Sequence, residues 1–476
     1  MKKIFIILVG VGLLIGCKKF EDLNTNPKQP TSVPSNFLLT SAQKNLVDIM
    51  TSSNVNRNIF RLWSQHWTET TYFDESRYDI VTRGIAANFW TALYRDVLKD
   101  LQASKDAVKS DALITDETVR ASQLATIDVM EVYTWHILVN TFGNVPYSQS
   151  LDINTPLPAY DDAKTIYTDL FKRLDDDMTA LSAGSSSFSS GDLIYSGDNS
   201  MWLKFAATLK MRMALCLAET DAPSAKSKFE AALPMAMSSS ADNATFHYLT
   251  TPPNTNPVWV DLVQSGRKDF IASETMVKLL DSLNDPRMPL YFTTNNAGIY
   301  KGGINGTGNS YTKNSKPSLA VRAADAPSTL ISYTEVEFML AEAAARNWSV
   351  SGTAQDHYNA GITESILEWG GSSGDASAYI AQSFVDYTSA ESGATWKEKI
   401  GNQKWLALYN RGFDAWTEWR RLDFPNLIPP SGLSNSDIPT RFTYPINEQT
   451  INAQNYSAAS SAIGGDNLTT KLFWDN

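Results

Sequence analysis

Cysteine, histidine and positive charge are all scarce in this sequence. Its 476 residues include two cysteines and four histidines, and the formal net charge is −11. One disulfide at most can form, so the fold depends on its hydrophobic core for stability. The negative charge argues against a nucleic-acid partner, because binding to phosphates calls for a basic face.

Long apolar runs are also absent. The uncharged run near the N-terminus, Ile4 to Gly16, has 13 residues, whereas a helix that spans a bilayer needs about 20. No later segment is apolar enough over such a length. The composition is nevertheless 43% hydrophobic with 13 tryptophans, so we expect a large packed core.

Motifs for catalysis and metal binding are missing as well. No histidine has the HExxH spacing that sets two zinc ligands on one helix face. Residues 370–374 match G-x-S-x-G, but a predicted helix precedes them where a nucleophile elbow requires a strand. We predict no metal site, no cofactor and no enzymatic activity. A glycosidase built on two converging carboxylates stays open, since 51 acidic residues offer many pairs.

The N-terminus carries a secretory pattern. Lys2 and Lys3 precede the short apolar run, which ends in Leu14-Ile15-Gly16-Cys17. This ending resembles the lipobox of bacterial lipoproteins, in which the chain is cut before the cysteine and the thiol is acylated. We expect residues 1–16 to be removed and Cys17 to anchor the protein, at about 0.8 kcal/mol per buried methylene. The alternatives are a signal peptide with a chance cysteine and a fraying hydrophobic N-terminus.

Helical periodicity is nearly continuous from Pro34 to about Ala183. Residues 123–147 are apolar almost all round, which predicts a central helix that ends at Gly143 and Pro146 and makes His136 a core histidine. In the helix predicted over 160–181, Asp175-Asp176-Asp177 lie mostly on the solvent-exposed face. Its apolar stripe consists of Ile166, Leu170, Leu174, Met178 and Leu181.

Further helical blocks follow. Residues 202–217 predict a helix with Cys216 on its buried face. Residues 331–348 and 354–370 predict a helix pair whose interleaved small and large residues resemble a tetratricopeptide pair. Residues 396–425 add another block, ended by Pro425. The pattern indicates one mainly helical body.

Irregular segments interrupt these helices. Residues 184–200, 238–270 and 286–330 are rich in turn-forming residues, and the region from Asn426 onward also lacks periodicity. Long loops in a compact domain are usually functional. We therefore expect them to form a ligand face on the helical scaffold.

One aromatic cluster is the best candidate for a binding site. We predict that the helix carrying Trp63 and Trp67 ends near Thr70 and that a loop follows. Aromatic rings suit the weakly polar faces of sugars, and nearby charged side chains can bond hydroxyls. The alternatives are a core stripe of tryptophans and plain loop packing. The predicted ligand contacts are Trp67, Tyr72, Phe73 and Tyr78, with Tyr291, Tyr300 and Tyr311 as secondary candidates.

Several segments, taken in order, point to one family. The most distinctive are FGNVPY at 142–147 and YPINEQTIN at 444–452. With these segments, the chain resembles the divergent SusD-like branch of the SusD/RagB family of nutrient-binding outer-membrane lipoproteins. The resemblance covers the whole mature chain, expected as one domain over residues 17–476. Supporting segments lie at 88–102, 202–215, 340–348 and 403–425.

The resemblance implies about four tetratricopeptide-like helix pairs beneath a loop-rich ligand face. It implies a binding protein without catalytic activity, whose ligand is an oligosaccharide or, in RagB-like members, a peptide. It also implies a SusC-like TonB-dependent barrel as partner. The acidic surface-export tag of such lipoproteins corresponds loosely to residues 20–22. The family's ligand-binding aromatics share no motif, so none is carried over.

The leading hypothesis is a lipid-anchored protein of the outer membrane, facing the cell surface. It binds a nutrient glycan and delivers it to the barrel. Three alternatives stay open: the same fold binding peptides, a surface glycoside hydrolase, and a scaffold that makes protein contacts only.

Overall fold

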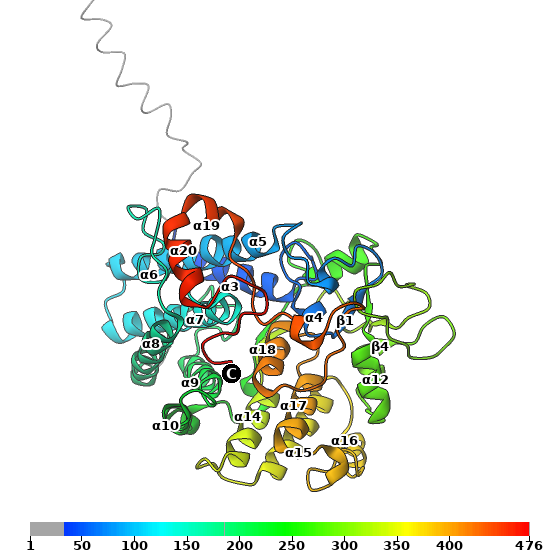
Figure 1. Cartoon of the computed structure of the whole chain (residues 1–476). Helices are drawn as coiled ribbons and strands as arrows, with labels where there is room; N and C mark the ends of the chain where they lie inside the picture. Colours follow the sequence, from blue (N-terminus) through cyan, green and yellow to red (C-terminus); the bar gives the residue numbers. More distant parts are fainter. Residues whose placement is uncertain (1–32, 185, 476) are drawn as a thin grey trace, which may run out of the picture.

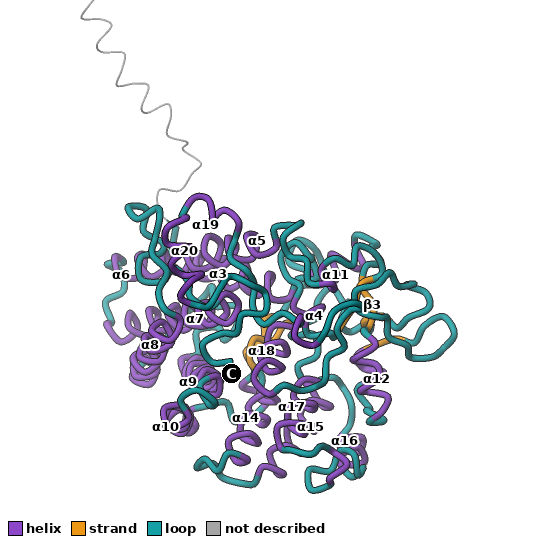
Figure 2. The backbone as a smooth tube through the Cα atoms, in the orientation of Figure 1, coloured by secondary structure: helices purple, strands orange, loops and turns teal. Residues whose placement is uncertain are grey.

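The computed structural model describes residues 33–184 and 186–475. Helices form a wide body, and long loops with part of the strands gather around β3 and β4 on one side of it, while β6 lies against α3 and α9 (Figures 1 and 2). The prediction of a mainly α protein built on tetratricopeptide-like helix pairs is confirmed. Cys17 and the rest of the predicted lipobox lie outside the described residues.

The N-terminal part of the body is made of packed helix pairs. Four helices of this part, α7 to α10, are each preceded by an aspartate. Its side chain accepts hydrogen bonds from backbone N–H groups of the first turn, which stabilises the helix end. A short α5 (Ile85–Thr91) runs through a π-helical stretch, Ala92–Leu98, into α6. The pairs are α3 (Ser35–Thr51) with α6 (Lys99–Ser110), α7 (Glu117–Phe142) with α8 (Ala163–Ala183), and α9 (Asn199–Cys216) with α10 (Ala222–Ala232).

Helix α7 is the predicted central helix. Nearly every residue from Ala125 to Phe142 is buried, and Gly143, with a φ of 85°, ends the helix. His136 is 1% exposed and hydrogen-bonded with Asn140 and Tyr167. Burial lowers its pKa to about 3. His136 is therefore a neutral core histidine, as expected.

The second half of the body confirms the two later helical blocks. Helix α14 (Tyr333–Ala345) packs on α15 (Ala354–Glu368), α17 (Trp396–Ala407) packs on α18 (Gly412–Leu422), and α16 (Ser373–Ile380) follows α15. Ser372 and Asp375 form a capping box at the start of α16. The G-x-S-x-G match is thus a helix cap.

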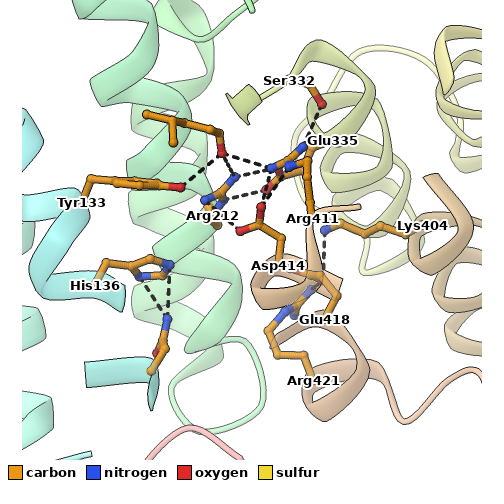
Figure 3. Close-up of polar contacts among 12 residues, drawn as sticks. Tyr133, His136, Arg212, Ser332, Glu335, Lys404, Arg411, Asp414, Glu418 and Arg421 are labelled. Atoms are coloured by element: carbon orange, nitrogen blue, oxygen red, sulfur yellow. Dashed lines mark hydrogen bonds and ion pairs between the residues drawn. The ribbon is translucent and has the colours of Figure 1, made fainter. Parts of the chain in front are cut away.

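Buried ion pairs join the two halves (Figure 3). Arg212 of α9 and Arg411, next to α18, each lie 2.6 Å from a carboxylate oxygen of Glu335 on α14. Asp414 completes the group at 3.3 Å from Arg212 and 2.7 Å from Arg411. Two cations and two anions balance, so removal of any one would leave a buried charge unpaired at a cost of about 3–5 kcal/mol.

Short strands tie distant loop segments together. The described residues contain three two-stranded antiparallel ladders, in which β1 pairs with β3, β2 with β6 and β4 with β5. The β1–β3 ladder joins residues 67–69 to residues 270–272, and the other two ladders pair segments within residues 244–331, so separate irregular segments are tied together. The strands are β1 (Trp67–Glu69), β2 (Ala244–Phe246), β3 (Phe270–Ala272), β4 (Phe292–Thr293), β5 (Lys316–Pro317) and β6 (Ser328–Ile331). Short helices among them are α4 (Phe60–Trp63), α11 (Pro257–Trp259), α12 (Glu274–Ser282) and α13 (Met288–Tyr291).

Three local predictions are wrong in part. The helix expected to continue to Thr70 ends at Trp63, because Gln65 adopts a φ of 56° and the chain turns into β1. The region after Asn426 is not wholly irregular, since it contains α19 (Ile446–Ile451) and α20 (Ala453–Ala462). Asp177, expected with its neighbours mostly on the solvent-exposed face, is buried.

The hydrophobic core extends over most of the described chain, from Leu39 to Trp474. Trp474 is 1% exposed, and its indole N–H donates to the side-chain oxygen of Asn140 on α7 at 2.8 Å. The C-terminal segment is therefore anchored in the helical body.

Candidate ligand-binding cleft

A cleft of about 260 Å³ opens on the loop-rich face beside Tyr72. We call it the Tyr72 cleft. Its walls come from segments 53–56, 69–72 and 261–270, together with Arg83. The pairing of β1 with β3 brings the last two segments together, and the backbone N–H of Thr70 extends this pairing by donating to the carbonyl of Asp269 at 2.9 Å.

Tyr72 presents its ring to solvent at the edge of this cleft. The side chain is 70% exposed and the residue has a φ of 55°, which lies in the left-handed region. Such a conformation costs about 1–2 kcal/mol for a residue other than glycine, so the surrounding contacts must hold it. The guanidinium of Arg83 lies 5.9 Å from the ring centre, and the backbone N–H of Asn309 donates to the carbonyl of Thr70 at 2.9 Å.

The other predicted contacts differ in accessibility. Phe73 is half-buried and lies against the loop at Gly308. Trp67 is only 1% exposed, and its indole N–H donates to the hydroxyl of Tyr409 at 3.1 Å. Tyr78 is 7% exposed and packs edge-on against Trp63. Burial leaves Trp67 and Tyr78 without an open ring face, so their placement favours the core alternative for these two residues.

The secondary candidates do not line the cleft. Tyr291 is fully buried and stacks on Tyr409 with ring centres 4.1 Å apart. Tyr300 and Tyr311 are half-buried, and the ammonium of Lys316 lies 5.1 Å from the ring centre of Tyr311.

A buried carboxyl pair underlies the cleft. Glu69 is 2% exposed and accepts hydrogen bonds from the backbone N–H and the hydroxyl of Ser76, at 3.0 and 2.7 Å. Burial, together with the nearby charge of Glu75, raises the pKa of Glu69 to about 9. Glu75 is ion-paired with Arg83. At neutral pH Glu69 is therefore uncharged, and Arg83 is held in place beside Tyr72.

Open polar groups complete the walls. The hydroxyl of Ser53 donates to Asp261 at 2.9 Å, and Arg267 pairs with Asp269 at 2.7 Å. Sequence reasoning missed these residues, because they carry no motif and because Asp261, Arg267 and Asp269 lie about two hundred positions from Tyr72. An aromatic ring next to carboxylates, hydroxyls and amides can bind a ligand that has both an apolar face and hydroxyl groups.

Neither a metal site nor a membrane-spanning helix is found in the part of the chain that the structure describes. Among residues 33–184 and 186–475, no group of three or more His, Cys, Asp or Glu side chains is arranged to hold a metal ion. Within the same residues, no helix has the length and apolar character needed to cross a membrane.

The fold and the cleft define a class of protein, a tetratricopeptide-like scaffold whose loops carry an aromatic-edged polar cleft. Within this class, the chain belongs to the SusD-like family described as "Starch-binding associating with outer membrane", whose profile matches residues 27–445. The family predicted from the sequence is thereby confirmed.

Solved structures agree with this assignment. A chitin-binding protein is similar at a TM-score of 0.79 and 26% identity, over 93% of this chain and 99% of its own. A chitin-binding SusD homolog from Flavobacterium johnsoniae has a TM-score of 0.78 and 25% sequence identity, and the match covers 92% of this chain and 98% of the homolog. A SusD homolog from Bacteroides thetaiotaomicron VPI-5482 has a TM-score of 0.75 and 26% sequence identity, and the match covers 92% of this chain and 99% of the homolog. No curated protein sequence matches the chain significantly.

Proposed function

We propose that this protein binds a nutrient glycan at the Tyr72 cleft. The observation that carries the proposal is a strained, 70% exposed tyrosine held at the edge of a polar cleft on the loop-rich face. Its ring can stack on a sugar, while the neighbouring polar groups bond hydroxyls. The family's description and the chitin-binding relatives support an oligosaccharide as ligand. Tyr72 is the contact we propose in the cleft itself, and the half-buried Phe73, which does not line the cleft, is a proposed contact beside it.

The cleft binds its ligand without turnover. A glycosidase needs two accessible carboxyl groups on either side of the scissile bond. Of the three acids that line the cleft, Glu69 is 2% exposed and Asp269 is paired with Arg267. Asp261 is then the single acid in this set that is neither buried nor ion-paired, which supports a binding role.

We also propose that Cys17 carries the lipid anchor and that the protein delivers its ligand to a SusC-like TonB-dependent barrel at the cell surface. The family's association with the outer membrane supports this location. A Cys17→Ala chain should leave the membrane fraction, and the wild-type chain should co-purify with a barrel. A variant that stays fully membrane-bound would contradict the anchor.

Binding can be measured by calorimetry with chitin and starch oligosaccharides. Tyr72→Ala should weaken binding about tenfold or more, equivalent to about 1.4 kcal/mol, because it removes the exposed ring and nothing from the core. Phe37→Ala is the matched control, since Phe37 is 62% exposed on α3 and does not line the cleft. It should bind as the wild type does.

Other outcomes separate the alternatives. If Tyr72→Ala binds glycans as tightly as the wild type, the Tyr72 cleft is not the site. Binding of peptides alone would favour the RagB-like alternative. Release of reducing sugar would contradict the proposed absence of catalysis. Absence of any ligand, with co-purification of a barrel, would favour the scaffold alternative.

A further inference from the structure

A second cavity, of about 320 Å³, lies where the end of α15 meets the segment before α18, the end of α3 and strand β6. We call it the Trp369 cavity. It shares no lining residue with the Tyr72 cleft. Its volume falls within the range of small-molecule sites, and the proposed glycan site makes no use of it.

Aromatic rings form one wall of the Trp369 cavity. The half-buried Trp369 packs against Tyr291 and Tyr409, whose ring centres lie 5.0 and 5.4 Å from its own. Tyr133 and Phe413 are nearly fully buried and continue the wall. The indole of Trp369 is therefore a rigid, partly open apolar surface.

Most charges around the cavity already have partners. Arg411 and Asp414 belong to the balanced ion group with Arg212 and Glu335 (Figure 3). Arg61 donates to the carbonyls of Ser52 and Thr51 and to the side-chain oxygen of Asn410. These contacts hold the three charged side chains in place in the cavity lining.

Of the two acids among the described residues that line the cavity, Asp414 is ion-paired and Glu368 is not. The Glu368 carboxylate accepts a hydrogen bond from the hydroxyl of Thr334 at 2.9 Å, and no lysine or arginine of the described chain forms an ion pair with it. Glu368 lines the cavity at the end of α15, where the residue as a whole is exposed. Removal of its hydration by the surrounding atoms raises its pKa; the charge of Arg411 and the Thr334 hydroxyl oppose this rise, and the nearby acids Glu364 and Glu335 add to it. A cation in direct contact with the carboxylate would stabilise its charged form.

We propose that the Trp369 cavity is a second ligand site, which takes a small organic amine with its ammonium group at Glu368 and its apolar body against Trp369. The carboxylate supplies the ion pair, and the indole offers an apolar face to the hydrocarbon part of the amine. Asn410 also lines the cavity; its side-chain oxygen accepts from Arg61 at 2.7 Å, and its amide nitrogen carries two hydrogen-bond donors. A hydroxyl or carbonyl group on the amine would meet these donors.

The test compares cyclohexylamine with cyclohexanol, which have the same ring size and differ in charge. Calorimetry with the purified protein near pH 8 keeps the amine protonated and Glu368 more fully ionised. Cyclohexylamine should bind at least tenfold more tightly than cyclohexanol. Glu368→Gln should abolish that preference, while its amide oxygen can still accept from Thr334. Trp369→Ala should weaken both probes.

Two further variants make the result specific. Glu364→Gln, one helical turn earlier on α15 and outside the cavity lining, should keep the preference within about twofold. Tyr72→Ala should bind cyclohexylamine normally, which separates this site from the proposed glycan site. Equal binding of the two probes to the wild type, or an undiminished preference in Glu368→Gln, would overturn the proposal.

Discussion

At the scale of single residues, Glu69 makes the clearest prediction about pH. Its folded-state pKa of about 9 lies above the ordinary value of 4.5. Between these values the unfolded chain loses a proton that the folded chain keeps, so stability falls as pH rises, by at most about 1.4 kcal/mol per pH unit. Glu69→Gln should remove this contribution. The urea midpoint of the variant should therefore depend less on pH between pH 5 and 9.

The matched control for Glu69 is Glu117→Gln, because the Glu117 side chain is 78% exposed. Its pH dependence should follow that of the wild type. If Glu69→Gln retains the full slope, the Glu69 carboxyl is ionised in the folded protein, and the raised pKa is wrong.

At the scale of elements, the α14–α15 pair depends on a glycine. A Cβ on Gly361 would lie 2.9 Å from the ring of Phe338, which is fully buried and has no room to shift. Gly361→Ala should therefore destabilise the protein by about 1–3 kcal/mol through overpacking. The free energy of unfolding in urea measures the effect.

Gly374 offers the opposite result in a neighbouring helix. A Cβ there would meet only the hydroxyl of Ser372, at 3.6 Å. Gly374→Ala in α16 should be neutral or stabilising by up to about 1 kcal/mol, because alanine favours helix. Equal effects of the two substitutions would show that helix propensity, and not the contact between α14 and α15, determines the cost at Gly361.

At the scale of the whole molecule, Trp474 anchors the C-terminal segment to the helical body. It is buried, bonds to Asn140 on α7, and lies with its ring centre 5.0 Å from the guanidinium of Arg420 on α18. Trp474→Ala should cost about 3–5 kcal/mol of unfolding free energy. The exposed Phe37→Ala should change it by less than about 0.5 kcal/mol. A near-neutral Trp474→Ala would mean that the C-terminal segment contributes little to the body.

The helical body was predictable because helices are encoded locally. The stripe from Ile166 to Leu181 is buried as expected, and Gly143 ends α7 where the sequence places the stop. The boundary at Trp63 was missed, since the turn at Gln65 depends on the pairing of β1 with β3, whose residues lie some two hundred positions further along. Strand pairing of this range leaves no periodic signal in three residues.

The sequence by itself determined the family, the helix pairs and the presence of an aromatic cluster, because each rests on the order and spacing of nearby residues. Only the tertiary structure decided which aromatics are open. Trp67 is covered by Phe270 and Tyr409, from segments far away in the chain, whereas Tyr72, five residues later, is turned outward by its left-handed backbone. Burial of a side chain depends on what packs over it, and that covering comes from distant segments brought together by the fold.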